Sequence, residues 1–364
     1  MRPARVIVDL AALRHNYRVA KQCHGGKVFA VIKANAYGHG AVACAKALGA
    51  EADAFAVACI EEALELRAAG IQQPILLLEG VFEANELVLV NRHQLWIAVA
   101  TPEQVAMIEC TPVAAPLHVW LKVDSGMHRL GITPSEAADV AKRLQATGKL
   151  ASLVWMTHFA RADEPDEIAT QHQTECFDQA MLGQSAAASL SNSAGILAHP
   201  RAHREWGRAG IMLYGSSPFA ERSAAELGLR PVMRFLSKLI SVRDLPAGEA
   251  IGYGGTFVTD KPMRVGVVAC GYADGYPRHA STGTPVSING RLSRVIGRVS
   301  MDMLAVDLTD LPDATVGSTV ELWGEHIPVD AVAKRAGTIS YELLCNVKRA
   351  AFEWQDGDTP QQAS

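Results

Sequence analysis

The feature that most constrains the fold of this 364-residue chain is a repeat of short apolar runs whose starts lie 20 to 36 residues apart. Each separation has room for a strand, a helix and two loops. The eight runs begin at positions 28 (VFAVIK), 54 (AFAVA), 74 (PILLL), 95 (LWIAV), 117 (LHVWLKV), 152 (SLVWM), 188 (ASLSNS) and 210 (GIMLYG). Eight such units predict an α/β fold, a (β/α)8 TIM barrel, with an open doubly wound sheet as the alternative.

Helix signals lie between these runs. Thr101-Pro102 and Thr133-Pro134 each place a capping hydroxyl before a proline in the first helical turn. Gly70 and Gly148 stand where the helices that follow the second and fifth runs are expected to end. The strands therefore alternate with helices, as a parallel barrel requires.

The pattern changes after about Met233, where β-branched runs are separated by turn signals such as Asn289-Gly290. We therefore expect a C-terminal mostly-β domain at residues 234–364, after a barrel domain at residues 1–233. The apolar strand at residues 4–10 precedes the first barrel strand and is a candidate to join the second domain.

Charge and cysteine usage exclude several functional classes. Lys plus Arg number 34 and Asp plus Glu number 38, giving a formal net charge of -4, so no polycationic footprint for nucleic acid or anionic lipid is present. The seven cysteines contain no CxxC pair, which is typical of reduced thiols in the cytoplasm. No run of 18 apolar residues predicts a membrane span, and the N-terminus lacks a signal-peptide pattern.

A lysine, Lys33, ends the first barrel strand, and Tyr37 follows four residues later. Active sites of such barrels lie at the carboxyl ends of the strands, so this lysine would point into the barrel opening. An apolar surrounding would lower its pKa, as an amine that forms a Schiff base requires. A surface lysine and a rim tyrosine are the alternative interpretation.

Phosphate sites in barrels are commonly built after the seventh and eighth strands. Here the seventh run continues into Asn192 and Ser193, and the eighth begins at Gly210 and Ile211, just after Arg208. Small residues with free backbone N–H groups favour anion binding, although such turns are common in any loop. Together with a Schiff-base lysine, a phosphate cradle is what pyridoxal phosphate needs.

The fifth and sixth runs supply Lys122, Arg129 and His158. A metal-dependent hydrolase with a carbamylated Lys122 could use such groups, but the first strand lacks paired histidines, and we expect no metal. In the second domain, Tyr253, Tyr272, the pair Met301-Asp302, and Tyr341 lie in turn-like segments whose composition is also common in ordinary hairpins.

Eight motifs in chain order resemble those of alanine racemases and span nearly the whole chain. They are AVIKANAYGHG at 30–40, KVDSGMHRLG at 122–131, MTHFA at 156–160, SNSAG at 191–195, RAGIMLYG at 208–215, IGYGGTF at 251–257, GYADGY at 271–276 and SMDM at 300–303. The resemblance implies a barrel that binds pyridoxal 5'-phosphate, a C-terminal β-domain and a small-molecule substrate, alanine. It also implies a head-to-tail homodimer with shared active sites.

The resemblance also implies roles for individual residues. Lys33 would bind the cofactor covalently, and Lys33 and Tyr253 would be the two catalytic groups. The other implied cofactor contacts are Tyr37, His158, Asn192, Ser193, Arg208, Gly210, Ile211 and Tyr341. The implied substrate contacts are Arg129, Met301, Asp302 and Tyr272, with Tyr253, Met301 and Asp302 contributed by the partner subunit. Lys122 matches a family lysine that is often carbamylated to steady Arg129.

These roles agree with the chemistry of racemisation. A proton must leave Cα on one face and return on the other, so two bases on opposite faces are needed, and Lys33 and Tyr253 are the natural pair. The pKa of Tyr253 would have to fall from about 10, for which His158 and Arg208 are candidate causes.

Three alternatives remain open. A decarboxylase on the same fold would need an acidic residue where Arg208 stands, and a non-catalytic cofactor carrier would leave the second domain without a purpose. A broad-specificity amino-acid racemase would share most motifs. The sequence does not distinguish supply of D-alanine for peptidoglycan from alanine catabolism.

Overall fold

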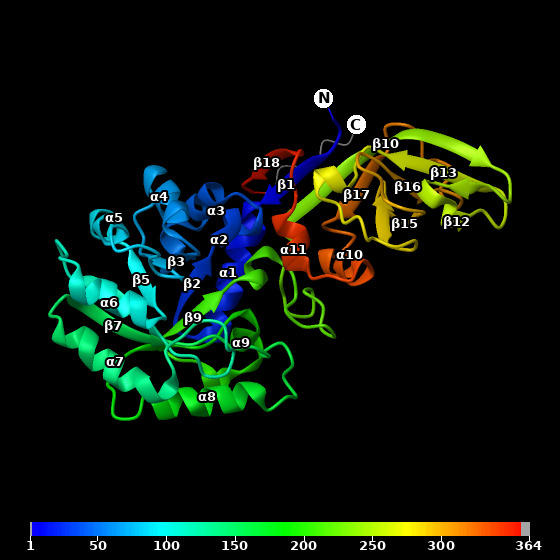
Figure 1. Ribbon diagram of the computed structural model, residues 1–364. Coiled ribbons are helices and arrows are strands. Elements are labelled where there is room, and N and C mark those ends of the chain that lie inside the picture. Colours follow the sequence, from blue (N-terminus) through cyan, green and yellow to red (C-terminus); the bar gives the residue numbers. More distant parts are fainter. Residues whose placement is uncertain (1, 358–364) are drawn as a thin grey trace.

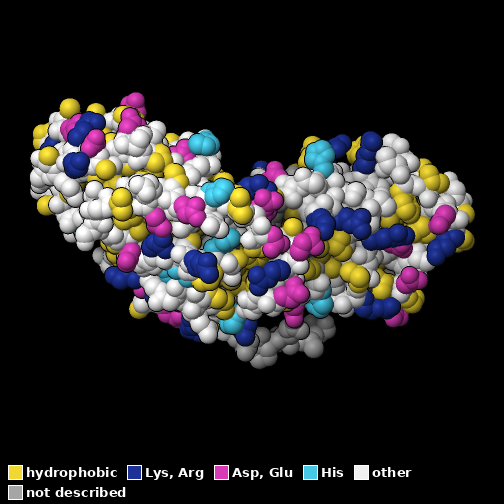
Figure 2. Space-filling model, turned by 90° about the horizontal axis from the view of Figure 1, so that it is seen from below, with side chains coloured by type: hydrophobic (Ala, Val, Ile, Leu, Met, Phe, Trp, Pro, Cys, Tyr) yellow, Lys and Arg dark blue, Asp and Glu magenta, His cyan; other side chains and the backbone are white. Residues whose placement is uncertain are grey.

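The computed structural model describes residues 2–357, which form two lobes joined side by side (Figure 1). The first lobe is an α/β barrel and the second is built mainly from antiparallel strands. Residues 358–364 of the expected second domain lie outside the described part. Figure 2 shows a hollow between the two lobes, and basic and acidic side chains are interspersed on the face that it presents.

The barrel sheet has eight parallel strands in the order β8-β7-β6-β5-β4-β3-β2-β9. Its strands are β2 (Lys27–Val31), β3 (Ala54–Val57), β4 (Ile75–Leu77), β5 (Trp96–Val99), β6 (Leu117–Lys122), β7 (Leu150–Met156), β8 (Ala188–Ser189) and β9 (Trp206–Ala209). The two end strands approach one another, and Arg208 N donates to Ser191 O at 2.9 Å just beyond β8. The barrel is therefore nearly closed, which confirms the predicted fold class.

The position of the eighth strand was wrongly predicted. The strand is β9, immediately before Gly210, whereas the apolar run after it forms the short 3-10 helix η3 (Ile211–Tyr214). Gly215 ends this helix in the left-handed conformation, at φ 75°. Tyr214 is buried and donates to Val31 O at 2.9 Å, so the run packs over the end of β2. An apolar run by itself does not separate a buried strand from a buried helix.

Most of the helices cover the outside of the barrel, and the predicted starts and stops lie at the ends of α4, α6 and α7. They are α1 (Leu10–His24), α2 (Lys33–Tyr37), α3 (Ala41–Leu48), α4 (Ile60–Ala68), α5 (Glu86–Arg92), α6 (Pro102–Cys110), α7 (Pro134–Ala146), α8 (Ala169–Ala180) and α9 (Ser193–Ala198), with short 3-10 turns η1 (Gly49–Glu51) and η2 (Pro200–Ala202). The Thr101 hydroxyl accepts from Gln104 N, which confirms that cap. The cap predicted at Thr133 is wrong, because its hydroxyl accepts from no backbone N–H of α7 and donates to the Glu136 carboxylate instead. Gly70 and Gly148 are left-handed just past their helices, at φ 87° and 65°.

The barrel interior is filled by aromatic rings contributed by different strands. Phe29, Trp96, Trp120 and Trp206 form one cluster with ring centroids 4.7 to 6.2 Å apart. Side chains two residues apart on a strand share a face. The residues two positions beyond Trp120 and Trp206 therefore also point inward, one layer nearer the carboxyl ends of the strands. That layer begins the candidate site.

The second lobe is a closed antiparallel sheet with two added strands, in the order β13-β16-β15-β14-β17-β10-β1-β18 with a further β10–β13 pairing. Its strands are β1 (Arg5–Asp9), β10 (Met233–Leu245), β13 (Met263–Val268), β14 (Pro285–Ile288), β15 (Arg291–Ile296), β16 (Leu304–Asp307), β17 (Thr319–Trp323) and β18 (Ala351–Gln355). A small hairpin of β11 (Ala250–Ile251) and β12 (Phe257–Val258), the turns η4 (Tyr253–Gly255) and η5 (Tyr272–Asp274), and the helices α10 (Val329–Ala336) and α11 (Ser340–Cys345) complete it.

Both ends of the described chain belong to the second lobe. β1 pairs antiparallel with β10 and parallel with β18, and α1 of the barrel begins directly after it. The Asp9 side chain caps α1 by accepting from Ala12 N at 2.8 Å. This junction couples the two lobes, because the same residue ends a strand of one and begins a helix of the other. Among residues 2–357, no helix is long and apolar enough to cross a membrane.

Candidate active site

Lys33 lies at the carboxyl end of β2, on a turn of unusual geometry. The four residues after it, Ala34 to Tyr37, all have φ between 51° and 55°. They form a left-handed helical turn, which non-glycine residues rarely adopt in succession. The turn brings Tyr37 back toward the barrel, where its ring stacks on Tyr214 with a centroid distance of 4.8 Å. Lys33 and Tyr37 are thus held by one rigid turn.

A small cradle lies beside Tyr37, between the ends of β8 and β9. The Ser193 hydroxyl accepts from Gly210 N at 2.9 Å. A Cβ at position 210 would approach Tyr37 Oη within 2.8 Å and Ser193 Oγ within 3.7 Å. Glycine therefore leaves room between two hydroxyl groups and backbone N–H groups, which are the donors that an anion such as phosphate prefers.

Two flanking residues complete this cradle. Asn192 caps α9 by accepting from Gly195 N at 3.0 Å, so its side chain organises the loop. The Tyr341 ring lies 5.9 Å from that of Tyr37. Burial raises the pKa of Tyr341 to about 12 and raises that of Tyr37 further above its usual range. Both hydroxyl groups therefore remain protonated and able to donate hydrogen bonds at neutral pH.

Arg208 is the inward residue two positions beyond Trp206, and only 3% of it is exposed. Its guanidinium donates to Ser189 O at 2.9 Å and to Thr157 O at 2.6 Å, at the ends of β8 and β7. Burial lowers the pKa of Arg208 to about 10, so the group stays charged at neutral pH. Strand-end carbonyl groups therefore fix a positive charge in the barrel opening.

His158 lies against this arginine, with its Nδ1 3.3 Å from Arg208 Nη2. Burial, and then the charge of Arg208, hold the pKa of His158 well below its usual value. The imidazole is therefore neutral at physiological pH.

Lys122 is the inward residue two positions beyond Trp120, and it is 8% exposed. Burial, followed by the charges of Arg208 and Arg129, lowers the pKa of Lys122 to about 8. Arg129 lies on a short loop that closes through a hydrogen bond from Ile132 N to Lys122 O at 2.8 Å. Within residues 2–357, none of Lys33, Lys122, Arg129 and Arg208 forms an ion pair, so the opening favours anionic ligands.

Among the candidate residues of the second lobe, Tyr341 joins this cluster, whereas the hairpin that carries Tyr253 lies away from it in the same chain. Tyr253 lies in η4, between β11 and β12, and β12 is at the end of the second lobe away from the barrel (Figure 1). Its side chain is 71% exposed, and Met301 is 53% exposed. Both side chains are therefore accessible to a second molecule.

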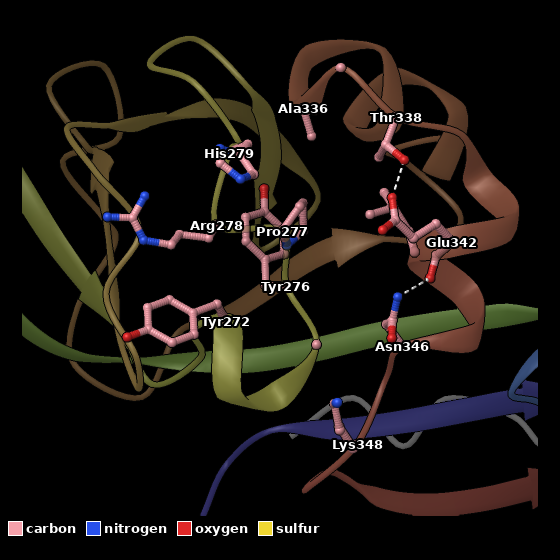
Figure 3. Close-up of a pocket in the computed structure, with 13 residues that line it drawn as sticks. Tyr272, Tyr276, Pro277, Arg278, His279, Ala336, Thr338, Glu342, Asn346 and Lys348 are labelled. Carbon is pink, nitrogen blue, oxygen red and sulfur yellow. Dashed lines mark hydrogen bonds between the residues drawn. The ribbon is translucent and has the colours of Figure 1, made fainter.

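Tyr272 lines a cavity of about 330 Å³ in the second lobe, together with Arg278, His279, Glu342 and Lys348 (Figure 3). Lys33 does not line this cavity. Tyr272 therefore lies in a cavity that the barrel lysine does not line.

Asp302 belongs to a salt-bridge network that the sequence analysis missed. Buried Asp274 accepts from Arg2 at 2.6 and 2.9 Å and from Gly271 N at 2.9 Å. Arg2 also donates to Asp302 O at 2.6 Å, and Arg349 donates to the Asp302 carboxylate at 2.8 Å. The network holds the Tyr272 turn against the Met301-Asp302 loop. Asp274 lies within the GYADGY motif, but no local pattern marks the two arginines, which come from opposite ends of the chain.

No group of three or more His, Cys, Asp or Glu side chains that could hold a metal ion occurs in the described part of the chain. The barrel cluster instead consists of a strand-end lysine, a buried arginine and an anion cradle. The fold and this site define a class: a barrel protein whose opening gathers cationic groups and a small cradle beside a strand-end lysine.

Comparison with known proteins identifies the family. The family model "Alanine racemase, N-terminal domain" matches residues 8–218, and "Alanine racemase, C-terminal domain" matches residues 232–353. An "Alanine racemase, catabolic" from Pseudomonas putida is 59% identical over 354 residues, covering 97% of this chain and 99% of the relative. An alanine racemase from Azoarcus is 56% identical over 355 residues, covering 98% of this chain and 100% of the relative.

Solved structures agree with these relatives. A biosynthetic alanine racemase from Pseudomonas aeruginosa superposes with a TM-score of 0.95 at 50% identity, covering 98% of this chain and 100% of that one. An alanine racemase from Acinetobacter baumannii superposes with a TM-score of 0.93 at 40% identity, with the same coverage of both chains. This chain belongs to the alanine racemase family, a family of isomerases.

Proposed function

We propose that this protein interconverts L-alanine and D-alanine with pyridoxal 5'-phosphate, using two bases that come from different subunits of a homodimer. The observation that supports the proposal best is the cradle between Tyr37, Ser193 and Gly210, in which Tyr37 belongs to the same left-handed turn as Lys33. A phosphate held there would keep the rest of an attached molecule within reach of the lysine.

The residues present fit pyridoxal phosphate. The cradle lacks a side chain at Gly210, where a Cβ would lie 2.8 Å from Tyr37 Oη, and it offers hydroxyl and N–H donors. We assign the phosphate to Tyr37, Ser193, Gly210, Ile211 and Tyr341, with Asn192 shaping the loop. We assign the ring to Arg208, facing the pyridine nitrogen, and to His158. Lys33 would hold the cofactor covalently.

When bound, the cofactor supplies an electron-withdrawing ring that stabilises negative charge at Cα of the amino acid. Lys33 would move the Cα proton on one face and Tyr253 on the other. Arg208 keeps its own proton, because its pKa is about 10. Beside a bound ring it would therefore leave the ring nitrogen unprotonated, which would limit delocalisation and favour return of the proton to Cα.

The substrate carboxylate would be oriented by Arg129 and by the partner's Met301, Asp302 and Tyr272. Lys122 would support Arg129 as a carbamate. The pKa of about 8 supports this assignment, because a substantial fraction of the amine is neutral near physiological pH and able to react with carbon dioxide. The resulting negative charge would offset the nearby cations.

A head-to-tail homodimer would bring Tyr253 of one chain to Lys33 of the other. The exposure of Tyr253 and Met301, and the position of the β11–β12 hairpin at the end of the second lobe away from the barrel, support this arrangement. We assign residues 1–233 to the barrel domain and 234–364 to the second domain, with residues 4–10 in the second. The pairing of β1 with β10 and β18 supports the latter assignment.

The same reaction would serve D-alanine supply or alanine breakdown. One similar relative is named catabolic and another is named biosynthetic. We place the enzyme in the cytoplasm, a proposal that the free state of all seven cysteines supports.

The test is to incubate the protein with L-alanine and pyridoxal phosphate in deuterated water, followed by chiral analysis and mass measurement. We expect D-alanine with one deuteron at Cα, and much slower turnover of serine and lysine. Equal turnover of all three would indicate a broad-specificity racemase. Release of carbon dioxide without D-alanine would indicate a decarboxylase.

A further inference from the structure

In two barrel helices, a side chain in the first turn accepts a hydrogen bond from a backbone N–H group four residues earlier. In α4, Glu62 Oε2 accepts from Ala58 N, four residues earlier, at 2.8 Å. In α6, Gln104 Oε1 accepts from Ala100 N, also four residues earlier, at 2.8 Å. Ala58 and Ala100 are the residues directly after β3 and β5. A single side-chain oxygen is therefore enough to secure the chain where it leaves a barrel strand.

The second polar atom of each side chain explains why one residue is an acid and the other an amide. Gln104 Nε2 donates to two carbonyl groups, Glu79 O at 2.7 Å and Val81 O at 3.1 Å. Glu62 Oε1 instead accepts from Ala34 N at 2.6 Å. A glutamine at position 62 would turn an N–H donor toward one of two N–H groups, so the site needs both oxygens of a carboxylate.

The residue that Glu62 binds is the first of the left-handed turn. For L-residues the left-handed conformation is unfavourable at every position, and Ala34 to Tyr37 occupy four such positions in succession. Such a turn persists only where its surroundings determine it. Trp354 Nε1 donates to His39 O at 2.8 Å just beyond the turn, so contacts secure it at both ends.

We propose that Glu62 is a positioning residue for the reaction. Its carboxylate joins the end of β3 to the backbone directly after Lys33, and this holds the left-handed turn that aims Lys33 and Tyr37 at one bound molecule. The inference rests on the proposed function only in taking Lys33 and Tyr37 as cofactor contacts.

The test is Glu62→Gln, with Glu86→Gln as the matched control. Glu86 also accepts from backbone N–H groups ahead of its helix, Phe82 N at 2.6 Å and Glu83 N at 3.3 Å, but with a single oxygen and outside the candidate site, so a glutamine there keeps the acceptor. We expect about tenfold weaker binding of pyridoxal phosphate to the apo-protein and at least about tenfold faster hydrogen exchange at residues 34–37 in Glu62→Gln alone, from loss of one hydrogen bond to a charged acceptor. The melting temperatures of the two variants should be similar.

A second variant separates positioning from general stability. Glycine adopts positive φ without strain, so Ala34→Gly should restore most of the affinity that Glu62→Gln loses. It should also restore a folded chain if Glu62→Gln alone does not fold. Unchanged exchange and affinity in Glu62→Gln, equal losses in Glu86→Gln, or failure of glycine to restore either property would each overturn the proposal. Neither readout depends on which amino acid is turned over, so failure of the racemase proposal would be recognised separately.

Discussion

The barrel opening and the exposed face of the second lobe differ in how they prepare their residues. In the barrel, Arg208 and Lys122 are buried and fixed by strand ends, and burial shifts the pKa of both. In the second lobe, Tyr253 and Met301 are exposed, and only the backbone around them is secured. One chain therefore builds the cationic part of the site in its barrel. It exposes on its second lobe the part that would act in the site of another chain.

The largest loss of activity is expected from a change in the barrel opening, at Lys33. Lys33→Ala should lower racemisation by at least about 10⁴-fold, because it removes both a base and the covalent link to the cofactor. Mass spectrometry after borohydride treatment with pyridoxal phosphate checks the link, with the wild-type chain as the control. A mass gain retained by the variant would show that another lysine binds the cofactor.

A change at Tyr253 in the second lobe should impair proton exchange of one alanine enantiomer more than that of the other. We expect Tyr253→Phe to lose Cα proton exchange from L-alanine by about 10²-fold or more, while exchange from D-alanine through Lys33 persists. Net racemisation cannot reveal this difference, because the two directions are linked by an equilibrium constant of about 1, so each enantiomer must be followed by deuterium uptake. Equal losses for both enantiomers would contradict the assignment of faces.

A change at Arg208 should alter the products as well as the rate. Arg208→Glu places an acid where the guanidinium lies, which would favour a protonated ring nitrogen and a longer-lived carbanion. We expect racemisation to fall and pyruvate, the product of transamination, to rise above the wild-type level. Arg208→Ala is the control, since it removes the charge without adding an acid. No increase in pyruvate with Arg208→Glu would count against this role.

Lys122 should give the smallest effect, seen as a pH dependence of stability. Its pKa is about 8 in the folded chain and about 10.5 when exposed, so its charge destabilises the folded state fully below pH 8, and the penalty disappears as the pH rises to about 10.5. Lys122→Met never carries the charge. In buffer free of carbon dioxide, its advantage in free energy of unfolding should shrink by about 3 kcal/mol across this range. A constant difference would contradict the lowered pKa.

The sequence predicts most of the barrel because its information is periodic. Apolar runs, the Thr101 cap and helix-ending glycines such as Gly70 each depend on local chemistry. The eighth strand was misplaced because GIMLYG is equally apolar whether it enters a sheet or packs over one. Local rules also favour a right-handed turn after Lys33, and the left-handed one depends on contacts from distant elements.

The candidate site also contains residues that local sequence patterns reveal and residues that only the tertiary fold brings together. Motifs point to Lys33 and Arg208 because they lie at or just after strand ends, and the two-residue period of a strand fixes the direction of Arg208. Tyr37 follows in the same motif, but its direction comes from the left-handed turn. The residues that support them are set by the tertiary fold: Glu62 lies in another βα unit, and Arg2 meets Asp274 across 272 positions of sequence. No spacing rule connects such pairs.

The central claim is that one site takes Lys33 and Tyr253 from different chains, and mixing two inactive variants tests it most directly. When Lys33→Ala and Tyr253→Phe chains are unfolded and refolded together, half of the random dimers pair the two variants, and each has one intact site. We predict about a quarter of the wild-type racemase activity. Activity no higher than that of the separate variants, in a mixture shown by mass spectrometry to contain mixed dimers, would contradict the shared site.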